Sequence, residues 1–337
     1  MIVRRLQKHE AIVSRRALLS GLASCSALAL CGCSGLDAAG TRFDASSLSV
    51  DPTLLVTTTR KPVNGGRAKP WFGPERSSTI TVARAKLVAP DDSRFSLAAV
   101  GLADWRVDEV RPISGGVDDL LAQAGGGADV LIYVHGFKQT FESTALDAAR
   151  ISDGIRFRGR TMVFSWPSKA GLLDYAYDRD SAMWSRDDFE RVLHSIIANP
   201  NTGRIHIIAH SMGTMLALES LRQLQARNGD TVADRIGSVV FAAPDIDMDV
   251  FASATNRMGP LARKITVITA TNDRALVLSG EIAGGMTRVG AAEKASIEQL
   301  GVHVIDASEE GWGIINHDLF LSNAQVRRVI RRSIDAA

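Results

Sequence analysis

The chain has 337 residues, 45% of them hydrophobic, and a formal net charge of +2. Residues 1–32 contain five basic residues and one acidic residue, so +4 belongs to this segment and −2 to the remainder. The excess of basic residues therefore lies in the N-terminal segment, and the charge of the chain does not predict binding to nucleic acid. The roughly 305 residues that follow are enough for one large domain with a substantial core.

The N-terminal segment has the pattern of a bacterial export signal. Basic residues precede an apolar stretch at residues 17–30, which is 14 residues long and therefore shorter than the ~20 residues that span a bilayer. We expect a cleaved signal peptide over residues 1–32. The residues around Arg15 and Arg16 resemble a twin-arginine motif, which would mean export in the folded state. An ordinary Sec signal with two arginines remains the alternative.

A cysteine at the end of the signal is the expected lipidation site. Leu30-Cys31-Gly32-Cys33 resembles a bacterial lipobox, and Cys33 is preferred because small Gly32 precedes it, whereas bulky Leu30 precedes Cys31. By its resemblance to lipoprotein sorting signals, Ser34 after this cysteine favours the outer membrane, so we expect a lipid-anchored envelope protein facing the periplasm. All three cysteines lie in or at the end of the signal, so no internal disulfide or cysteine metal site is expected.

The rest of the chain predicts a tether followed by an α/β domain. Residues 33–53 are rich in Ser, Ala, Asp and Gly and predict a flexible tether. Residues 54–337 form the expected domain, with an N-terminal elaboration at 54–100 that includes strand-like runs at 54–59 and 79–87. From Asp129 onward, apolar strands alternate with amphipathic helices, which predicts a mostly parallel sheet covered on both faces. The expected helices are residues 141–155, 180–198, 212–226, a short one near 249, 291–300 and 324–334.

Residues 203–216 predict a strand that turns sharply into a helix, with Ser211 at the turn. The apolar run at 205–209 suits a strand covered on both faces. Such a turn needs small residues two positions either side of the serine, and Ala209 and Gly213 meet that need. The pattern predicts a serine nucleophile; a merely structural turn is the alternative.

The partners of such a serine should follow in the order acid, then histidine. Asp273 comes after the apolar run 264–270 and is the expected acid, with Asp245 or Asp247 as rivals whose simpler role is to cap a helix. Elimination of the other histidines leaves His317 in a Gly-rich loop as the expected base.

An oxyanion hole is expected beside the serine. Ala128 to Tyr133 predicts a buried strand that ends in His135-Gly136-Phe137. A glycine there lets the backbone turn, so that the amides of Phe137 and Met212 could both face a substrate carbonyl. An ordinary strand-to-helix turn could use the same residues.

Several further motifs carry a family resemblance. They are Val163-Phe164-Ser165-Trp166-Pro167-Ser168, Tyr177-Asp178-Arg179-Asp180-Ser181-Ala182, Ala209-His210-Ser211-Met212-Gly213 and Ala242-Ala243-Pro244-Asp245-Ile246-Asp247, with looser matches at Thr57-Thr58-Thr59-Arg60 and Phe72-Gly73-Pro74-Glu75-Arg76. Over roughly residues 54–322 the chain resembles a family of bacterial α/β-hydrolases long grouped as a domain of unknown function. The resemblance implies a hydrolase fold and triad without a settled substrate.

The substrate pocket is expected to lack a separate lid. Only about twenty residues follow Pro244 before the next strand, too few for the cap domain that many lipases insert there. The loop from Trp166 to Tyr177, which includes Tyr175, and residues 71–72 are expected to roof the pocket, and Gly136 is a further expected pocket residue. Packing of these aromatic residues on the sheet edge is the alternative.

Together these features predict a lipid-anchored envelope serine hydrolase of the carboxylesterase or lipase type. The expected substrate is a small-molecule or lipid ester, and the triad Ser211, Asp273 and His317 needs no metal or organic cofactor. Two alternatives stay open: an envelope scaffold or binding protein with a vestigial triad, and an acyltransferase that uses the same acyl-enzyme.

Overall fold

The computed structural model describes residues 53–88, 106–282, 284–309 and 319–337. The predicted signal peptide, the tether, Cys33 and His317 lie outside these residues. No helix in the described part of the chain is both long enough and apolar enough to span a membrane.

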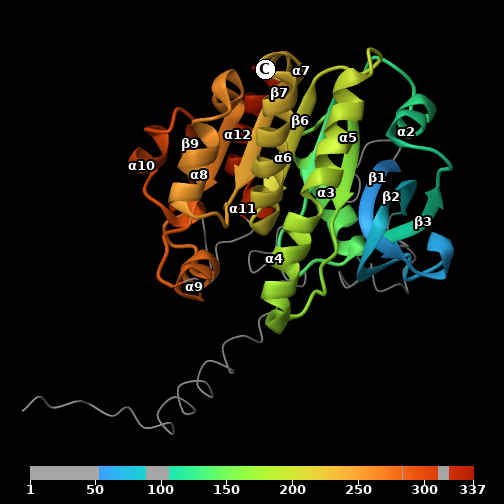
Figure 1. Ribbon diagram of the computed structural model, residues 1–337, viewed down its shortest axis with the longest axis horizontal. Helices are drawn as coiled ribbons and strands as arrows, with labels where there is room; N and C mark the ends of the chain where they lie inside the picture. Colours follow the sequence, from blue (N-terminus) through green and yellow to red (C-terminus); the bar gives the residue numbers. More distant parts are fainter. Residues whose placement is uncertain (1–52, 89–105, 283, 310–318) are drawn as a thin grey trace, which may run out of the picture. The chain divides into compact units, whose positions relative to one another are not determined.

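A nine-stranded sheet organises the described residues (Figure 1). Its order is β3 (Arg106–Pro112), β2 (Phe72–Val88), β1 (Thr53–Pro62), β5 (Arg160–Ser165), β4 (Val130–Val134), β6 (Ile205–His210), β7 (Ile236–Ala242), β8 (Ile265–Thr269) and β9 (His303–Asp306). Strands β1 and β4 to β9 pair in parallel, whereas β2 and β3 add an antiparallel edge. The mostly parallel sheet is therefore as predicted.

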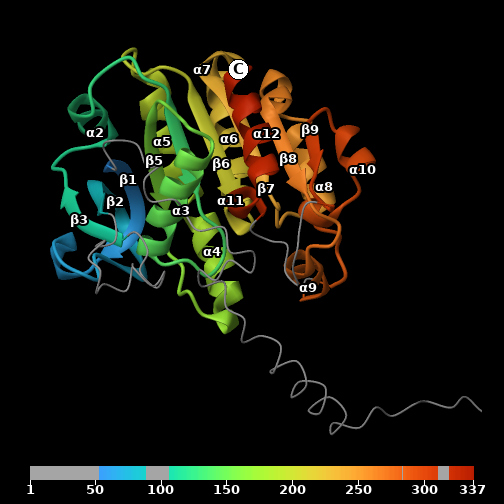
Figure 2. The same cartoon turned by 180° about the vertical axis from the view of Figure 1, so that it is seen from behind.

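Helices cover both faces of the sheet. On the face toward the viewer in Figure 1 lie α4 (Tyr175–Trp184), α5 (Arg186–Ala198), α6 (Met212–Asn228) and α8 (Met248–Thr255), and on the face seen in Figure 2 lie α3 (Phe141–Gly154), α11 (Leu319–Ser322) and α12 (Ala324–Asp335). The remaining helices are α2 (Val117–Gln123), α7 (Thr231–Arg235), α9 (Arg274–Ile282) and α10 (Lys294–Glu298), with short 3-10 turns at Asn64–Gly66, Leu172–Asp174, Gly259–Lys264 and Val289–Ala291.

Strand β4 explains why a continuous apolar run becomes a central strand. Val130, Ile132 and Val134 pack into the core beneath α5 and α6, whereas Leu131 and Tyr133 pack beneath α3 and α12. Successive side chains of a strand point to opposite faces, so a strand buried on both sides needs apolar residues at every position.

Two predicted elements differ in detail. The helix expected over residues 180–198 is two helices, α4 and α5, that meet at Ser185. The Ser185 hydroxyl donates to the carbonyl of Ser181 one turn earlier and also contacts Thr59 Oγ1, and such back-bonding bends helices. The N-terminal elaboration is larger than expected, since β2 runs for 17 residues and β3 follows it.

The connection from β7 to β8 contains only α8 and a 3-10 turn, which agrees with the absence of a cap domain there.

Candidate active site

The loops after β4 and β6 meet where the strand order reverses. From β4 the chain crosses to β5 on one side, whereas β6 lies on the other side of β4. Ligands of open parallel sheets bind in the crevice at such a switch point, beyond the carboxyl ends of the strands. The topology thus brings the predicted oxyanion loop, residues 135–139, next to Ser211.

Ser211 has the strained backbone expected of a nucleophile at a sharp turn. Its φ of 49° and ψ of −122° lie outside the usual regions for a residue with a side chain, a conformation that costs about 1–3 kcal/mol. The surrounding chain holds it there: its amide donates to the Ala242 carbonyl on β7 (2.9 Å), and its carbonyl accepts from the amide and the hydroxyl of Thr214 (3.0 and 2.5 Å).

Two glycines allow the oxyanion loop and the turn to come into contact. A Cβ on Gly213 would lie 2.1 Å from the His135 carbonyl oxygen, and a Cβ on Gly136 would lie 3.0 Å from Ser211 Cβ. Neither position can therefore hold a larger residue without displacing the backbone. Met212 is the first residue of α6, so its amide has no acceptor within the helix and is a suitable oxyanion donor beside Phe137.

His135 supports the oxyanion loop from within the core. Its Nδ1 lies 2.8 Å from the Gly136 carbonyl, and its Nε2 lies 3.1 Å from the Trp166 amide and 3.0 Å from the Trp166 carbonyl. In a neutral ring protonated on Nδ1, Nδ1 donates to the Gly136 carbonyl and Nε2 accepts from the Trp166 amide. Burial, and then the charge of Arg60, hold the pKa of His135 well below its usual range. The ring therefore stays neutral and serves structure.

Trp166 has a different position from the one predicted. Its ring is fully buried, stacks on His135 with centroids 4.4 Å apart, and donates from Nε1 to the His135 carbonyl (2.9 Å). Trp71 and Phe72 are also buried and pack on Phe141. These aromatic side chains fill the core instead of forming an exposed wall of a pocket, because their neighbours leave them no solvent-facing surface.

A buried arginine connects the N-terminal strands to the loops of the site. The Arg60 guanidinium donates to Ser165 Oγ (2.8 Å) and to the carbonyls of Ser168 (3.1 Å), Gly73 (3.5 Å) and Gln139 (2.7 Å). Burial lowers its pKa to about 10, so the group keeps its charge at neutral pH. Its fork of donors joins β1, the loop after β5 and the oxyanion loop.

Asp178 on α4 fixes the same two loops from the other side. Its carboxylate accepts from the Ser168 hydroxyl (2.5 Å) and from the amides of Lys169 (2.9 Å) and Lys138 (3.2 Å). Burial raises the pKa of Asp178, and these hydrogen bonds oppose that shift. The motifs that suggested a family thus contain the residues that shape the oxyanion loop.

The candidate acids have separate surroundings. Asp273 follows β8, is fully buried, and its Oδ1 accepts from the amides of Ala275 and Leu276 at the start of α9 (3.0 and 3.2 Å). Asp247 caps α8 through the amides of Asp249 and Val250, the simpler role foreseen for it.

Asp245 does not cap a helix. It pairs with buried Arg288 (Nε to Oδ1, 3.2 Å) and accepts from the hydroxyls of Tyr175 and Ser279. Tyr175 is only partly buried, and it packs against Phe137.

The described histidines other than His135 are poorly placed to act as the base. His210 packs on Phe320 of α11, with centroids 4.6 Å apart, whereas His194 on α5 and His303 on β9 are exposed. His206 is the second residue of β6, at the end of the strand opposite Ser211, and its Nε2 lies 3.7 Å from Asp129 Oδ2. The predicted base, His317, lies outside the described residues.

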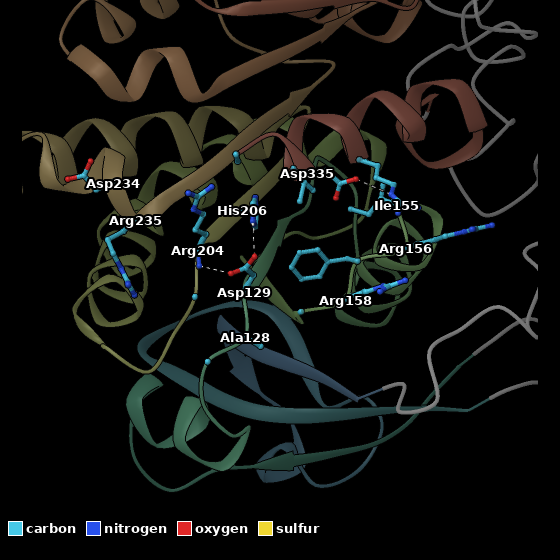
Figure 3. A pocket seen from close by; sticks show the side chains of 17 residues that line it. Ala128, Asp129, Ile155, Arg156, Arg158, Arg204, His206, Asp234, Arg235 and Asp335 are labelled. Atoms are coloured by element: carbon cyan, nitrogen blue, oxygen red, sulfur yellow. Dashed lines mark hydrogen bonds and ion pairs between the residues drawn. The ribbon is translucent and has the colours of Figure 1, made fainter.

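A hollow of about 970 Å³ lies at that opposite end of the sheet, around His206 and Asp129. Five arginines line it, but so do three aspartates. The labelled arginine side chains point in different directions and do not converge on one point (Figure 3). The hollow is separate from the site around Ser211 because it lies at the other end of the strands. Its mixed charges give it no single charged centre.

Comparisons with solved structures give distant likenesses. A serine hydrolase without a lid from Xanthomonas campestris is 13% identical, over 76% of this chain and 89% of that one, with a TM-score of 0.39. Est1E from Butyrivibrio proteoclasticus is 11% identical over 76% and 96%, with a TM-score of 0.40. A cutinase from Trichoderma reesei is 12% identical over 65% and 86%, with a TM-score of 0.31.

Comparisons of sequence identify the family. An uncharacterized protein from Nostoc is 38% identical over 61 residues, which cover 18% of this chain and only 16% of that protein. Residues 120–333, well over half of the chain, match the family described as alpha/beta hydrolase of unknown function (DUF900). The fold prediction is thereby confirmed, and the chain belongs to this DUF900 family of α/β hydrolases.

Proposed function

We propose that this protein is a serine hydrolase that cleaves carboxylic esters with Ser211 as its nucleophile. The observation that carries the proposal is the strained Ser211 backbone, at the sharp turn between β6 and α6, in contact with the glycine of the neighbouring loop. Strain persists only where the surrounding structure imposes it, and it gathers at functional sites. A structural turn could use glycine and would have no need of a strained serine.

The proposed reaction passes through an acyl-enzyme. Ser211 Oγ attacks the ester carbonyl, and His317 accepts the hydroxyl proton and passes it to the leaving alcohol. Asp273 holds the imidazole in the tautomer that accepts this proton. The amides of Phe137 and Met212 stabilise the oxyanion of the tetrahedral intermediate. Water then attacks the acyl-enzyme, His317 accepts a proton from that water and returns it to Ser211 Oγ, and the carboxylic acid leaves.

The position of Asp273 in the chain favours it as the acid, although its Oδ1 also accepts from two amides at the start of α9. Asp247 uses its carboxylate to cap α8, and Asp245 is surrounded by Arg288, Tyr175 and Ser279. Both oxygens of Asp245 are thus already engaged, one by Arg288 and Ser279 and the other by Tyr175. Asp273 stands after β8, where the orienting acid of this fold usually lies.

The location of the activity is part of the proposal. The N-terminal segment supports export, cleavage before Cys33 and lipid anchoring at the outer membrane, with the hydrolase domain in the periplasm. The proposed substrate is a small-molecule or lipid ester that reaches this compartment.

Reaction with a fluorophosphonate probe tests the nucleophile. The wild-type protein should be labelled on Ser211 and should hydrolyse p-nitrophenyl acetate, and Ser211→Ala should lose both properties while keeping its circular dichroism spectrum. Ser296→Ala changes an exposed serine on α10 and should behave as wild type. Full esterase activity in Ser211→Ala would assign the nucleophile elsewhere.

A further inference from the structure

A buried ion pair lies beside the nucleophile turn. Asp245 and Arg288 are only 5% and 2% exposed, and Arg288 Nε lies 3.2 Å from Asp245 Oδ1. Nε makes no hydrogen bond to any other described residue, so this contact is electrostatic and not a well-aligned hydrogen bond. Two charges removed from water need further partners to offset their lost hydration.

Two hydroxyl groups supply those partners. Tyr175 donates to Asp245 Oδ2 (2.8 Å), Ser279 donates to Oδ1 (2.6 Å), and the two hydroxyl oxygens lie 2.9 Å apart. Burial, and then the charge of Asp245, raise the pKa of Tyr175. The phenol therefore keeps its proton at neutral pH and remains a donor, so the ion pair fixes the position of the tyrosine.

The main chain attaches this cluster to the nucleophile. The Asp245 amide donates to the Ser211 carbonyl (3.3 Å), and the Gly290 amide donates to the Pro244 carbonyl (2.9 Å). A Cβ on Gly290 would lie 2.6 Å from the carbonyl carbon of Ala243. The segment after Arg288 thus packs directly against the segment that carries Asp245, and neither can shift without disturbing the turn.

The Tyr175 ring attaches the same cluster to the oxyanion loop. Its centroid lies 5.4 Å from that of Phe137, and the rings meet edge to face at 69°. Phe137 is the residue whose amide we assign to the oxyanion hole. One fixed side chain therefore connects the segment bonded to the nucleophile with the residue that should stabilise the oxyanion.

We infer that Tyr175 is a positioning residue that sets the distance between the oxyanion donor at Phe137 and Ser211. Its hydroxyl is held by the Asp245–Arg288 pair and its ring holds Phe137. The inference rests on the proposed hydrolase function. Misplacement of a catalytic group by about 1 Å can cost on the order of 100-fold in rate, so a loosened Phe137 should slow the reaction without preventing substrate binding.

Three variants separate the ring from the hydroxyl. Tyr175→Leu removes both, and Tyr175→Phe keeps the ring but releases it from Asp245. Tyr177→Phe is the matched control, because Tyr177 lies on the same helix and its hydroxyl donates to the Pro74 carbonyl (2.9 Å). This variant, like Tyr175→Phe, therefore loses a hydrogen bond made by a tyrosine hydroxyl. Melting temperatures and circular dichroism allow comparison at equal folded fraction.

The measurements are kcat and KM for p-nitrophenyl acetate and the inhibition constant of a trifluoromethyl ketone, whose hemiketal oxyanion occupies the hole. We expect kcat to fall about 10- to 100-fold in Tyr175→Leu and less in Tyr175→Phe, with KM changed by less than about threefold. The inhibition constant should rise in parallel with the loss of kcat, which a purely structural role would not produce.

Failure of the positioning role and failure of the proposed function would give different results. If the wild type reacts with the fluorophosphonate probe but kcat and the inhibition constant of Tyr175→Leu match those of Tyr177→Phe, the positioning role is overturned and the hydrolase stands. If the wild type neither reacts nor turns over ester, the proposed function fails and the inference with it. Should Tyr175→Leu not fold, the same comparison with Tyr175→Phe, which keeps the ring, decides.

Discussion

Gly136 is packed against Ser211 so closely that a Cβ at position 136 would lie 3.0 Å from Ser211 Cβ and 2.9 Å from His210 Nδ1. Such contacts are rarely found for real Cβ atoms, so either the loop or the turn would have to move. The small size of residue 136 thus links the position of the oxyanion loop to that of the nucleophile.

Gly136→Ala should fold but lose most esterase activity. The methyl group would push the oxyanion loop away from Ser211, and loss of one oxyanion donor costs about 10²–10³-fold in kcat. Gly116→Ala is the control, because no atom of the described residues lies within 4 Å of a Cβ there, and it should keep wild-type kinetics. Steady-state kinetics on both variants give the comparison, and wild-type turnover by Gly136→Ala would place the oxyanion hole elsewhere.

Arg60→Lys should lower both stability and activity. Lysine keeps the charge, but it cannot reproduce the fork of donors that joins Ser165, Ser168 and Gln139. Buried acceptors left without donors should reduce the free energy of unfolding by about 2–4 kcal/mol.

The control for this substitution is Arg84→Lys. Arg84 lies partly buried on β2, and its side chain forms no ion pair or hydrogen bond with another described residue. Urea unfolding followed by circular dichroism should give wild-type stability for Arg84→Lys. Equal stability of the two variants would mean that the Arg60 contacts contribute nothing net.

Asp273→Asn should lower kcat by about 10²–10⁴-fold, because the amide favours the wrong imidazole tautomer. Asp247→Asn should have almost no effect, since asparagine caps a helix as well as aspartate does and Asp247 acts only as the cap of α8. Asp245→Asn should reduce kcat by an intermediate factor, because it weakens the contact that holds Tyr175 in place. Kinetics at equal folded fraction rank the three, and a larger loss at Asp247 would move the acid to the preceding strand.

The local sequence was sufficient to predict the strand, the sharp turn and the helix around Ser211. The strand, turn and helix around Ser211 depend on residues within a few positions of one another, and so does the Asp247 cap. Periodicity likewise located α3, α6 and α12 to within two residues. Whether Asp273 and His317 complete a triad with Ser211 stays a prediction.

Contacts between distant segments were not predictable. Arg60 reaches Gln139 and Ser168, which are 79 and 108 residues away, and no local pattern marks a buried arginine as the partner of those carbonyls. Trp166 was expected to roof the pocket in the absence of a cap domain, but tertiary packing places its ring on His135. The only indication of a role for Arg60 in the sequence was the motif Thr57-Thr58-Thr59-Arg60, which resembles the family loosely.

Cys33→Ser should release the protein from membranes in soluble or unprocessed form. One acyl chain gives only weak, reversible membrane binding, so stable anchoring needs the several chains that bacterial lipoprotein processing supplies. Mass spectrometry of the N-terminal peptide and membrane fractionation, with Cys31→Ser as the control, test this. An unmodified N-terminus beyond Cys33, with the protein free in the periplasm, would overturn the anchor and leave the hydrolase proposal untouched.

His135 should make the protein less stable in mild acid. Its pKa in the folded state lies well below the usual 6.5 because of burial and Arg60. Between these two pKa values the unfolded chain binds a proton that the folded chain does not. The stability is therefore complete above about pH 6.5 and is lost as the pH falls, by up to about 1.4 kcal/mol per pH unit.

His135→Gln should remove this part of the pH dependence, although the variant is less stable at every pH. The quantity to measure is the difference in unfolding free energy between pH 7.5 and pH 5.5 by urea denaturation. His206, whose pKa burial also lowers, contributes in the same direction in both proteins and cancels in the comparison. Exposed His194 on α5 provides the control, because His194→Gln should keep the wild-type difference. If His135→Gln keeps it as well, the folded protein protonates His135 as readily as the unfolded chain does, and the lowered pKa that we assign to this ring is wrong.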